Sequence, residues 1–182
     1  MRCRLVHTFG LIILGMLAFA AGAAHAQTTS NGPYYATPSW DQQLPAFTRF
    51  IVLSNWDSQA VLDRETGLVW EQGPSGVDTW LGAQLDCAQK SVGNRLGWRL
   101  ATIQELASLI DPTIPFPGPK LPAGHPFSNV RSENYWSATT SARNASSALL
   151  VLFDVGFVGS DSKTNANIRI WCVRGGQGVD PQ

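Results

Sequence analysis

The amino-acid sequence predicts an α+β domain with antiparallel sheets, two helices and a long ordered loop. Strand-like segments come first and last, two helical segments lie between them, and a proline-rich stretch separates the second helix from the final strands. Cys87 falls in the first predicted helix and Cys172 in the last predicted strand. One disulfide between them would tie the two ends of the domain together.

The first 26 residues have the features of a signal peptide. Arg2 and Arg4 precede an apolar run from about residue 9 to residue 21, and small residues flank His25. Cleavage at such a site makes Gln27 the first residue of the exported chain. We therefore expect a periplasmic or extracellular protein with no integral membrane segment, because the apolar run is short for a membrane span. An uncleaved anchor is the alternative.

Composition narrows the possible partners. Cleavage would remove Cys3 and leave two cysteines in an oxidising compartment, where cysteines form disulfides. It would also leave 11 Lys+Arg against 13 Asp+Glu, a net charge of −2. Because nucleic-acid binding depends on neutralising phosphates, we expect no nucleic-acid partner. The remaining 156 residues suit one domain with its own core.

The domain is predicted to span residues 51–176, between an extended lead-in at 27–50 and a tail at 177–182. A short strand is expected near 49–53. Residues 60–63 and 68–71 read as the two arms of a hairpin, and Gly67 in its turn is free to take a positive φ.

The first helix is predicted from about Thr79 to Lys90, with Asp78 or Thr79 as its N-cap. Trp80 and Cys87 share one face at helical spacing, and we expect that face to point inward.

The second helix has a clearer start, because Thr102 and Glu105 form a capping box. Ile103, Leu106 and Ile110 give its apolar stripe, and Pro112 ends it.

The proline-rich stretch covers residues 112–126, where six of the fifteen residues are proline. Long ordered loops of this kind are uncommon and often functional. Four strands are expected after it, at residues 135–139, 148–153, 156–159 and 168–173.

Residues for catalysis or metal binding are few. His125 would be the only histidine after signal cleavage, and no nucleophile elbow accompanies it. Oxygen ligands for calcium are available in principle, but their spacing does not require such a site, and we expect no metal and no cofactor. Those ligands are Asn129, Ser132, Glu133, Asn134 and Asp161.

Four segments occur in an order that resembles a family of bacterial extracellular domains, typified by the C-terminal domain of the Legionella collagen-like adhesin. The resemblance covers about residues 61–176. The segments are Thr66–Glu71 (TGLVWE), Gly97–Leu106 (GWRLATIQEL), Asn134–Thr139 (NYWSAT) and Trp171–Gly176 (WCVRGG).

The resemblance implies a C-type-lectin-like fold, related also to formylglycine-generating enzymes, in which a disulfide links the first helix to the last strand. It implies structural roles for the signature residues, with Trp98 and Trp136 as core anchors and Arg99 as a hydrogen-bonding brace. The signature residues are Trp70, Trp98, Arg99, Leu100, Trp136, Ser137 and Trp171.

Three features of related proteins are missing here: collagen repeats, the Glu-Pro-Asn and Trp-Asn-Asp signatures of calcium-dependent lectins, and a spare cysteine pair. We therefore expect a non-catalytic binding module for a surface glycan or extracellular protein. Its candidate residues form two groups, one after the long loop and one in the turn before the last strand: Asn129, Arg131, Glu133, Asn134 and Tyr135, and Ser160, Asp161, Lys163 and Asn165.

The alternative is an acid–base hydrolase that uses Glu133 or Asp161. Such an enzyme needs a second group at working distance from the first carboxylate.

Overall fold

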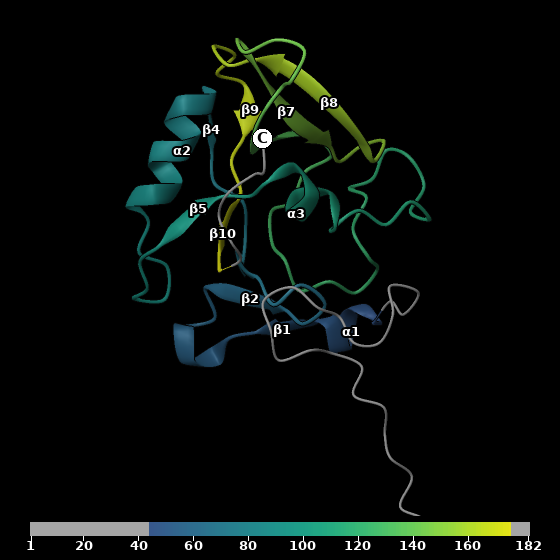
Figure 1. Cartoon of the computed structure of the whole chain (residues 1–182). Helices are drawn as coiled ribbons and strands as arrows, with labels where there is room; N and C mark the ends of the chain where they lie inside the picture. Colours follow the sequence, from purple (N-terminus) through teal and green to yellow (C-terminus); the bar gives the residue numbers. More distant parts are fainter. Residues whose placement is uncertain (1–43, 176–182) are drawn as a thin grey trace, which may run out of the picture.

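The computed structural model describes residues 44–175, which form two five-stranded sheets and three short α-helices (Figure 1). The first sheet has the order β1 (Phe50–Val52), β2 (Ala60–Asp63), β3 (Val69–Glu71), β10 (Cys172–Arg174) and β5 (Trp98–Leu100). The second has the order β4 (Val77–Asp78), β9 (Ile168–Arg169), β6 (Asn134–Thr140), β7 (Ser147–Leu152) and β8 (Phe157–Ser162). The helices are α1 (Ala46–Arg49), α2 (Trp80–Gln89) and α3 (Ile103–Ala107), with a 3-10 turn η1 at Ser54–Trp56.

Strand pairing is antiparallel in both sheets, apart from one parallel contact between Tyr135 of β6 and Arg169 of β9. The predicted α+β class with antiparallel sheets is therefore confirmed. The C-terminal strand β10 lies between β3 and β5, so the last strand of the domain is hydrogen-bonded to the predicted hairpin β2–β3. Gly67 in the hairpin turn has a φ of 71°, as predicted.

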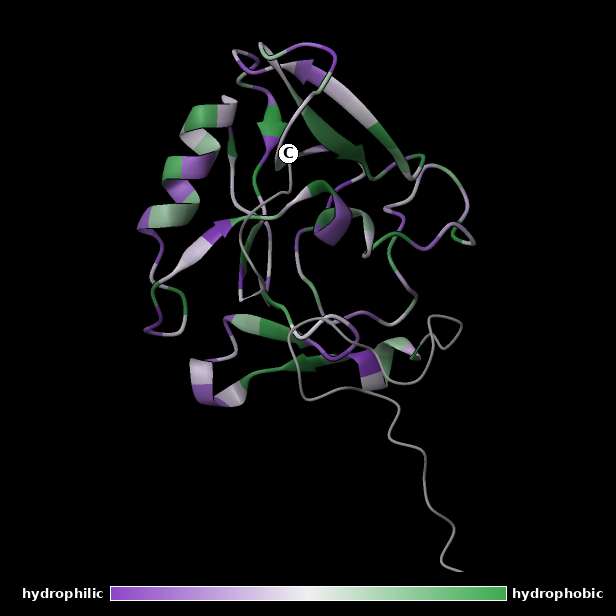
Figure 2. Ribbon diagram, in the orientation of Figure 1, coloured by the Kyte–Doolittle hydropathy of each residue, from purple (hydrophilic) through white to green (hydrophobic). Residues whose placement is uncertain are grey.

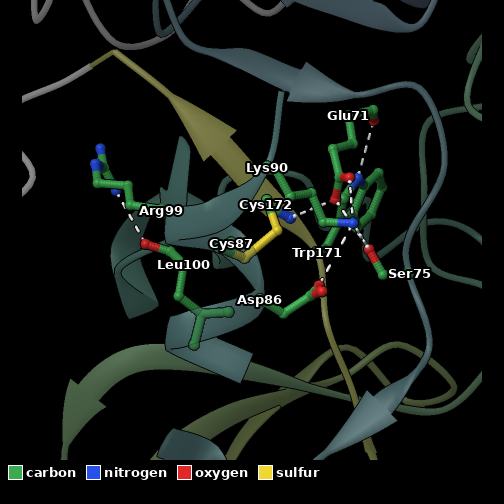
Figure 3. Close-up of a disulfide and its surroundings, with 9 residues drawn as sticks. All are labelled: Glu71, Ser75, Asp86, Cys87, Lys90, Arg99, Leu100, Trp171 and Cys172. Carbon is green, nitrogen blue, oxygen red and sulfur yellow. Dashed lines mark hydrogen bonds and ion pairs between the residues drawn. A yellow bond between two sulfur atoms is a disulfide. The ribbon is translucent and has the colours of Figure 1, made fainter. Parts of the chain in front are cut away.

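The predicted disulfide is present. Cys87 of α2 and Cys172 of β10 are bonded, with their Cα atoms 5.4 Å apart (Figure 3). Both cysteines are fully buried. The bridge joins residues 85 positions apart. Closing a loop of that length restricts the unfolded chain and stabilises the fold by roughly 4 to 5 kcal/mol.

Helix α2 begins after Thr79, whose hydroxyl accepts a hydrogen bond from the Gly82 N–H at 3.2 Å. Thr79 is therefore the cap, of the two predicted candidates. Ala83 and Cys87 are fully buried and Trp80 is half-buried. The predicted face does point inward.

Helix α3 carries the predicted capping box. The Thr102 hydroxyl accepts from the Glu105 N–H at 3.3 Å, and the Glu105 carboxylate accepts from the Thr102 N–H at 2.9 Å. The α-helix ends at Ala107, earlier than predicted, because Leu109 and Ile110 bond to carbonyls three residues back instead of four.

The single last strand predicted at 168–173 is wrong, because this segment is divided between the two sheets. Ile168–Arg169 belongs to the second sheet and Cys172–Arg174 to the first. Between them, Ile170 pairs with the loop before β4, donating to Gly76 and accepting from Ser75. The chain therefore crosses from one sheet to the other at Ile170–Trp171. Strands β4 and β5 were not predicted at all.

The predicted lead-in at 27–50 is wrong at its C-terminal end. Residues 46–49 form α1, and both Arg49 and Phe50 are buried. The Arg49 guanidinium bonds to both Asp63 carboxylate oxygens, at 3.0 and 2.8 Å, and lies 2.9 Å from Glu65. The predicted signal peptide, the rest of the lead-in and the tail at 177–182 lie outside the described residues.

Two apolar clusters fill the domain. One surrounds Trp171, whose ring centroid lies 4.9 Å from that of Phe127 and 5.5 Å from that of Trp70. The other includes the disulfide with Trp98 and Trp136, which are 2% and 0% exposed. In Figure 2 the hydrophobic residues follow the inner strands, and hydrophilic residues gather at the ends of strands and in the turns. The expectation that Trp98 and Trp136 are core anchors is confirmed.

The proline-rich stretch forms an irregular loop between α3 and β6. Leu121 and Phe127 are buried in the first cluster. The Lys120 N–H donates to the Phe153 carbonyl at 2.7 Å, and the Ser128 N–H donates to the Gln72 carbonyl at 2.9 Å. The first of these hydrogen bonds ties the loop to the residue after β7, and the second ties it to the residue after β3. The loop is therefore fixed to both sheets.

Candidate functional site

The first predicted group of ligand-binding residues lies where the long loop enters β6. Tyr135 is fully buried there, so its side chain offers no surface to a ligand, which corrects this part of the prediction. Its hydroxyl accepts from the Arg131 N–H at 2.8 Å and donates to the Arg131 carbonyl at 3.1 Å. Burial is the main cause that raises the pKa of Tyr135. Tyr135 positions the backbone of its neighbours.

The side chains of Arg131 and Glu133 project from this fixed backbone and are 65% and 45% exposed. Glu133 accepts from the Arg169 Nε at 2.6 Å, and its other oxygen lies 4.0 Å from the Arg131 guanidinium. Asn129 is exposed with a φ of 55°, and Asn134 is half-buried at the start of β6. The loop thus displays a carboxylate between two guanidinium groups, with amides beside it in the sequence. We call Asn129, Arg131, Glu133, Asn134 and Arg169 the loop edge.

The second predicted group does not lie wholly in a turn. Ser160 and Asp161 belong to β8, which corrects their placement, and only Lys163 and Asn165 lie in the turn that follows. Asp161 accepts from the Ser162 N–H at 2.6 Å and from the Asn165 side-chain amide at 2.8 Å. Its carboxylate is therefore occupied by its own turn.

Lys163 is held by two neighbours. Its ammonium donates to the Thr140 hydroxyl at 2.9 Å and lies 4.0 Å from the ring centroid of Trp80. Such a cation–π contact is an electrostatic attraction between the ammonium and the face of the ring. Trp80 in turn donates its indole N–H to the Ser137 carbonyl at 2.8 Å, so Lys163 joins the last turn to α2 and β6.

The two groups lie at opposite ends of the second sheet. Asn134 pairs with Leu152, whereas Asp161 pairs with Ala148. Glu133 and Asp161 are therefore displaced by about five residues along the strands, roughly 16 Å at about 3.3 Å per residue. They cannot act together on one bond, and the five oxygen ligands considered for calcium do not converge.

His125 and the possible metal ligands are the other residues considered in the sequence for chemistry. The Nδ1 of His125 is buried and has no hydrogen-bond partner within residues 44–175. Burial lowers the pKa of His125. In that same range no group of three or more His, Cys, Asp or Glu side chains is arranged to hold a metal ion.

The signature residues pack or brace the domain. The Arg99 guanidinium bonds to both Glu105 oxygens, at 2.8 and 2.7 Å, and to the Leu100 and Gly175 carbonyls. This confirms Arg99 as a brace between β5, α3 and the end of β10. Ser137 donates to the Leu149 carbonyl at 2.8 Å. Trp70, Leu100, Trp136 and Trp171 are buried.

Sequence reasoning missed a pocket of about 540 Å³ beside α1. Buried Arg49, held by the Asp63 and Glu65 carboxylates, forms its charged wall. Asp111 and the loop prolines Pro112 and Pro122 also line it. The sequence carries a signal for this pocket, because Arg49 precedes a hairpin in which Asp63 ends the first arm and Glu65 lies in the turn, but the expectation of an extended lead-in overlooks it.

The family comparison assigns the chain to a class of bacterial domains associated with an adhesin. The model of the Lcl C-terminal domain family matches residues 59–174, and the protein is therefore a member of that family. No curated protein matches the chain. Across residues 44–175, no helix is long and apolar enough to cross a membrane.

Proposed function

We propose that this protein is an exported, non-catalytic binding module with a C-type-lectin-like fold, and that it recognises a surface glycan or an extracellular protein through the loop edge. Membership of a family named for an adhesin domain supports extracellular recognition. The disulfide supports export, because such bonds persist in oxidising compartments.

We choose the loop edge as the binding surface because its backbone is rigid. The backbone of the loop edge is fixed from within, because the buried Tyr135 hydroxyl makes two bonds to Arg131 and the Glu133 carbonyl accepts from Phe153. Exposed guanidinium and carboxylate groups on a fixed backbone lose little conformational freedom on binding. They offer several donors and acceptors for hydroxyls, amides or charged side chains.

The separation of Glu133 from Asp161 favours binding over hydrolysis by these two carboxylates. Glu133 is ion-paired with Arg169 at 2.6 Å, and Asp161 lies at the far end of the sheet. An acid–base hydrolase needs a carboxyl that can hold a proton beside its substrate and a second group at working distance from it.

A glycan array and a pull-down from bacterial and host surface proteins test the proposal. We expect Arg131→Ala and Glu133→Gln to lose at least about tenfold in affinity for whatever ligand the unmodified protein captures. Arg143→Ala is the matched control, since Arg143 is exposed in the β6–β7 turn. Equal loss in the control, or full binding by both loop-edge variants, would contradict the assignment. Glycan cleavage that Glu133→Gln abolishes would favour the hydrolase instead.

A further inference from the structure

Two arginine side chains lie against one tryptophan ring beside the first sheet. The guanidinium carbons of Arg95 and Arg174 are 5.3 and 5.5 Å from the ring centroid of Trp56. Arg95 lies in the turn before β5 and Arg174 in β10, whereas Trp56 ends the 3-10 turn η1. Three segments that are far apart in the sequence therefore meet at one aromatic ring. We call these three residues the arginine cluster.

The backbone around the arginine cluster is fixed. The Gly93 N–H donates to the Gln59 side-chain oxygen at 3.0 Å, which ties the turn before β5 to the segment after η1. A Cβ on Gly93 would lie 2.6 Å from the Trp56 Cβ, so the turn packs directly against the tryptophan. The Arg174 Nε donates to the Leu96 carbonyl at 2.8 Å. The cluster is therefore assembled before any ligand arrives, and binding costs it little conformational freedom.

The positive charges of the cluster have no counter-ion in the described part of the chain. Neither Arg95 nor Arg174 forms an ion pair within residues 44–175, although Asp57 follows Trp56 in the sequence. Two like charges beside one ring repel each other, and the face of the ring offsets part of that cost. A negative group from outside the domain would remove the repulsion and accept from guanidinium N–H groups. The cluster therefore favours an anionic ligand.

A row of apolar side chains continues from Arg174 across the same face of the first sheet. The register pairs Arg174 with Val69, Val69 with Leu62, and Leu62 with Ile51. Residues that oppose each other in neighbouring antiparallel strands lie on one face. Val69 and Leu62 are half-buried, and Ile51 is 39% exposed. Helix α2 packs against β5, and β1 and β2 lie at the other end of the sheet (Figure 1). This apolar row (Ile51, Leu62 and Val69) is therefore open at its β1 end.

We propose that the arginine cluster and the apolar row form a docking surface for an acidic peptide segment of another protein. A carboxylate of the segment binds the two guanidinium groups through charge-assisted hydrogen bonds, and neighbouring apolar side chains of the same segment pack on the row. Charge complementarity selects an anionic partner. The apolar row favours a peptide over a sugar chain, because a hydroxyl-rich sugar has no apolar side chains to place there. This surface is separate from the loop edge, so the inference does not depend on the proposed function.

Peptide titration followed by NMR tests this surface. The probes are two acetylated peptide amides of equal length, one alternating glutamate with leucine and the other glutamine with leucine. We expect the exported protein to bind the glutamate peptide at least about tenfold more tightly, and high salt to remove most of the difference. The signals that shift should include the side-chain Nε–H groups of Arg95 and Arg174 and the indole N–H of Trp56.

Substitutions locate the binding. Arg95→Ala and Arg174→Gln should each weaken binding of the glutamate peptide about fivefold and affect the glutamine peptide little. Arg143→Ala is the matched control, because Arg143 is exposed in the β6–β7 turn of the other sheet. Ile51→Thr shortens the apolar row and should weaken both peptides by a similar factor. Circular dichroism with thermal unfolding verifies that the variants fold.

Four results would overturn the proposal: no binding of the glutamate peptide at millimolar concentration, equal affinity for the two peptides, full binding by both arginine variants, or an equal loss in Arg143→Ala. Polygalacturonate, a carboxylated polysaccharide, is the last probe. If it binds through Arg95 and Arg174 while the glutamate peptide does not bind, the anionic partner is a glycan and the assignment to a peptide is wrong.

Discussion

The carboxylate of Glu71 lies 3.0 Å from the ammonium of Lys90, and this ion pair joins β3 to the end of α2 beside the disulfide (Figure 3). Glu71 also accepts from the Cys172 N–H at 3.0 Å, and Lys90 also donates to the Ser75 hydroxyl at 2.6 Å. Burial is the largest influence on the Glu71 carboxyl and raises its pKa, although Lys90 and Cys172 offset part of that effect.

Removing Lys90 should destabilise the domain because it leaves a buried carboxylate without its counter-ion. We expect Lys90→Met to lower the free energy of unfolding by about 2 to 3 kcal/mol at pH 7. In this variant the pKa of Glu71 rises further, so the folded state binds a proton that the unfolded chain releases. The deficit should therefore shrink as the pH falls toward about 5.

Urea unfolding at both pH values measures this effect. The double variant Glu71→Gln, Lys90→Met removes the buried charge altogether, and we expect it to recover part of the lost stability at pH 7. A deficit in Lys90→Met that stays constant with pH would show that the loss comes from packing alone.

The disulfide should contribute a large share of the stability. We expect the double variant Cys87→Ala, Cys172→Ala to lose roughly 4 kcal/mol and to melt at a markedly lower temperature. Differential scanning calorimetry measures this loss. The unmodified protein unfolded in a reducing agent is the matched comparison, and an unchanged melting temperature in both would mean that the bridge is idle.

Glu105 serves both the cap of α3 and the brace from Arg99. Burial alone would raise the pKa of Glu105, but the Arg99 hydrogen bonds and charge, with the Thr102 N–H, outweigh it and lower the pKa. Its contribution is therefore present above the unfolded pKa and is lost as the pH falls through the lower folded value. Glu105→Gln keeps an acceptor for the cap but removes the charge, and should cost about 1 to 2 kcal/mol at pH 7 and much less near pH 3.

Thr102→Ala separates the two roles of Glu105, because it removes only the cap. Its cost of about 1 kcal/mol should be the same at both pH values in urea unfolding. If Glu105→Gln behaves in the same pH-independent way, the Arg99 brace does not stabilise the domain.

Short sequence motifs were enough to predict those features of the fold that depend on a few particular residues. The capping box at Thr102 and the cysteine pair are readable from the sequence because each rests on a few residue types at fixed positions. The split of the last strand could not be read, because Ile168, Ile170, Trp171 and Cys172 are all buried. Neither strand alternation nor a polar break marks the crossing between sheets.

The candidate site was predicted less well, for a related reason. Tyr135 and Trp136 face opposite apolar clusters, so neither face of β6 meets water there and a polar-looking tyrosine is buried. The pocket beside α1 depends on Arg49 reaching Asp63, 14 residues away. Such a pair is visible only once β1 and β2 are known to be adjacent.

Gly82 in the first turn of α2 should resist a substitution that normally stabilises helices. An alanine in place of an exposed helical glycine usually gains up to about 1 kcal/mol. Here a Cβ on Gly82 would lie 2.3 Å from the Asp78 carboxyl carbon, while Asp78 accepts from the Thr79 N–H at 2.6 Å. Gly82→Ala should therefore displace Asp78 and lower the free energy of unfolding by about 1 to 2 kcal/mol in urea.

Gln84→Ala in the same helix is the matched control and should stay within about 0.5 kcal/mol of the unmodified protein. A gain in stability for Gly82→Ala would show that Asp78 moves aside without loss, and that the start of α2 is held by the Thr79 cap alone.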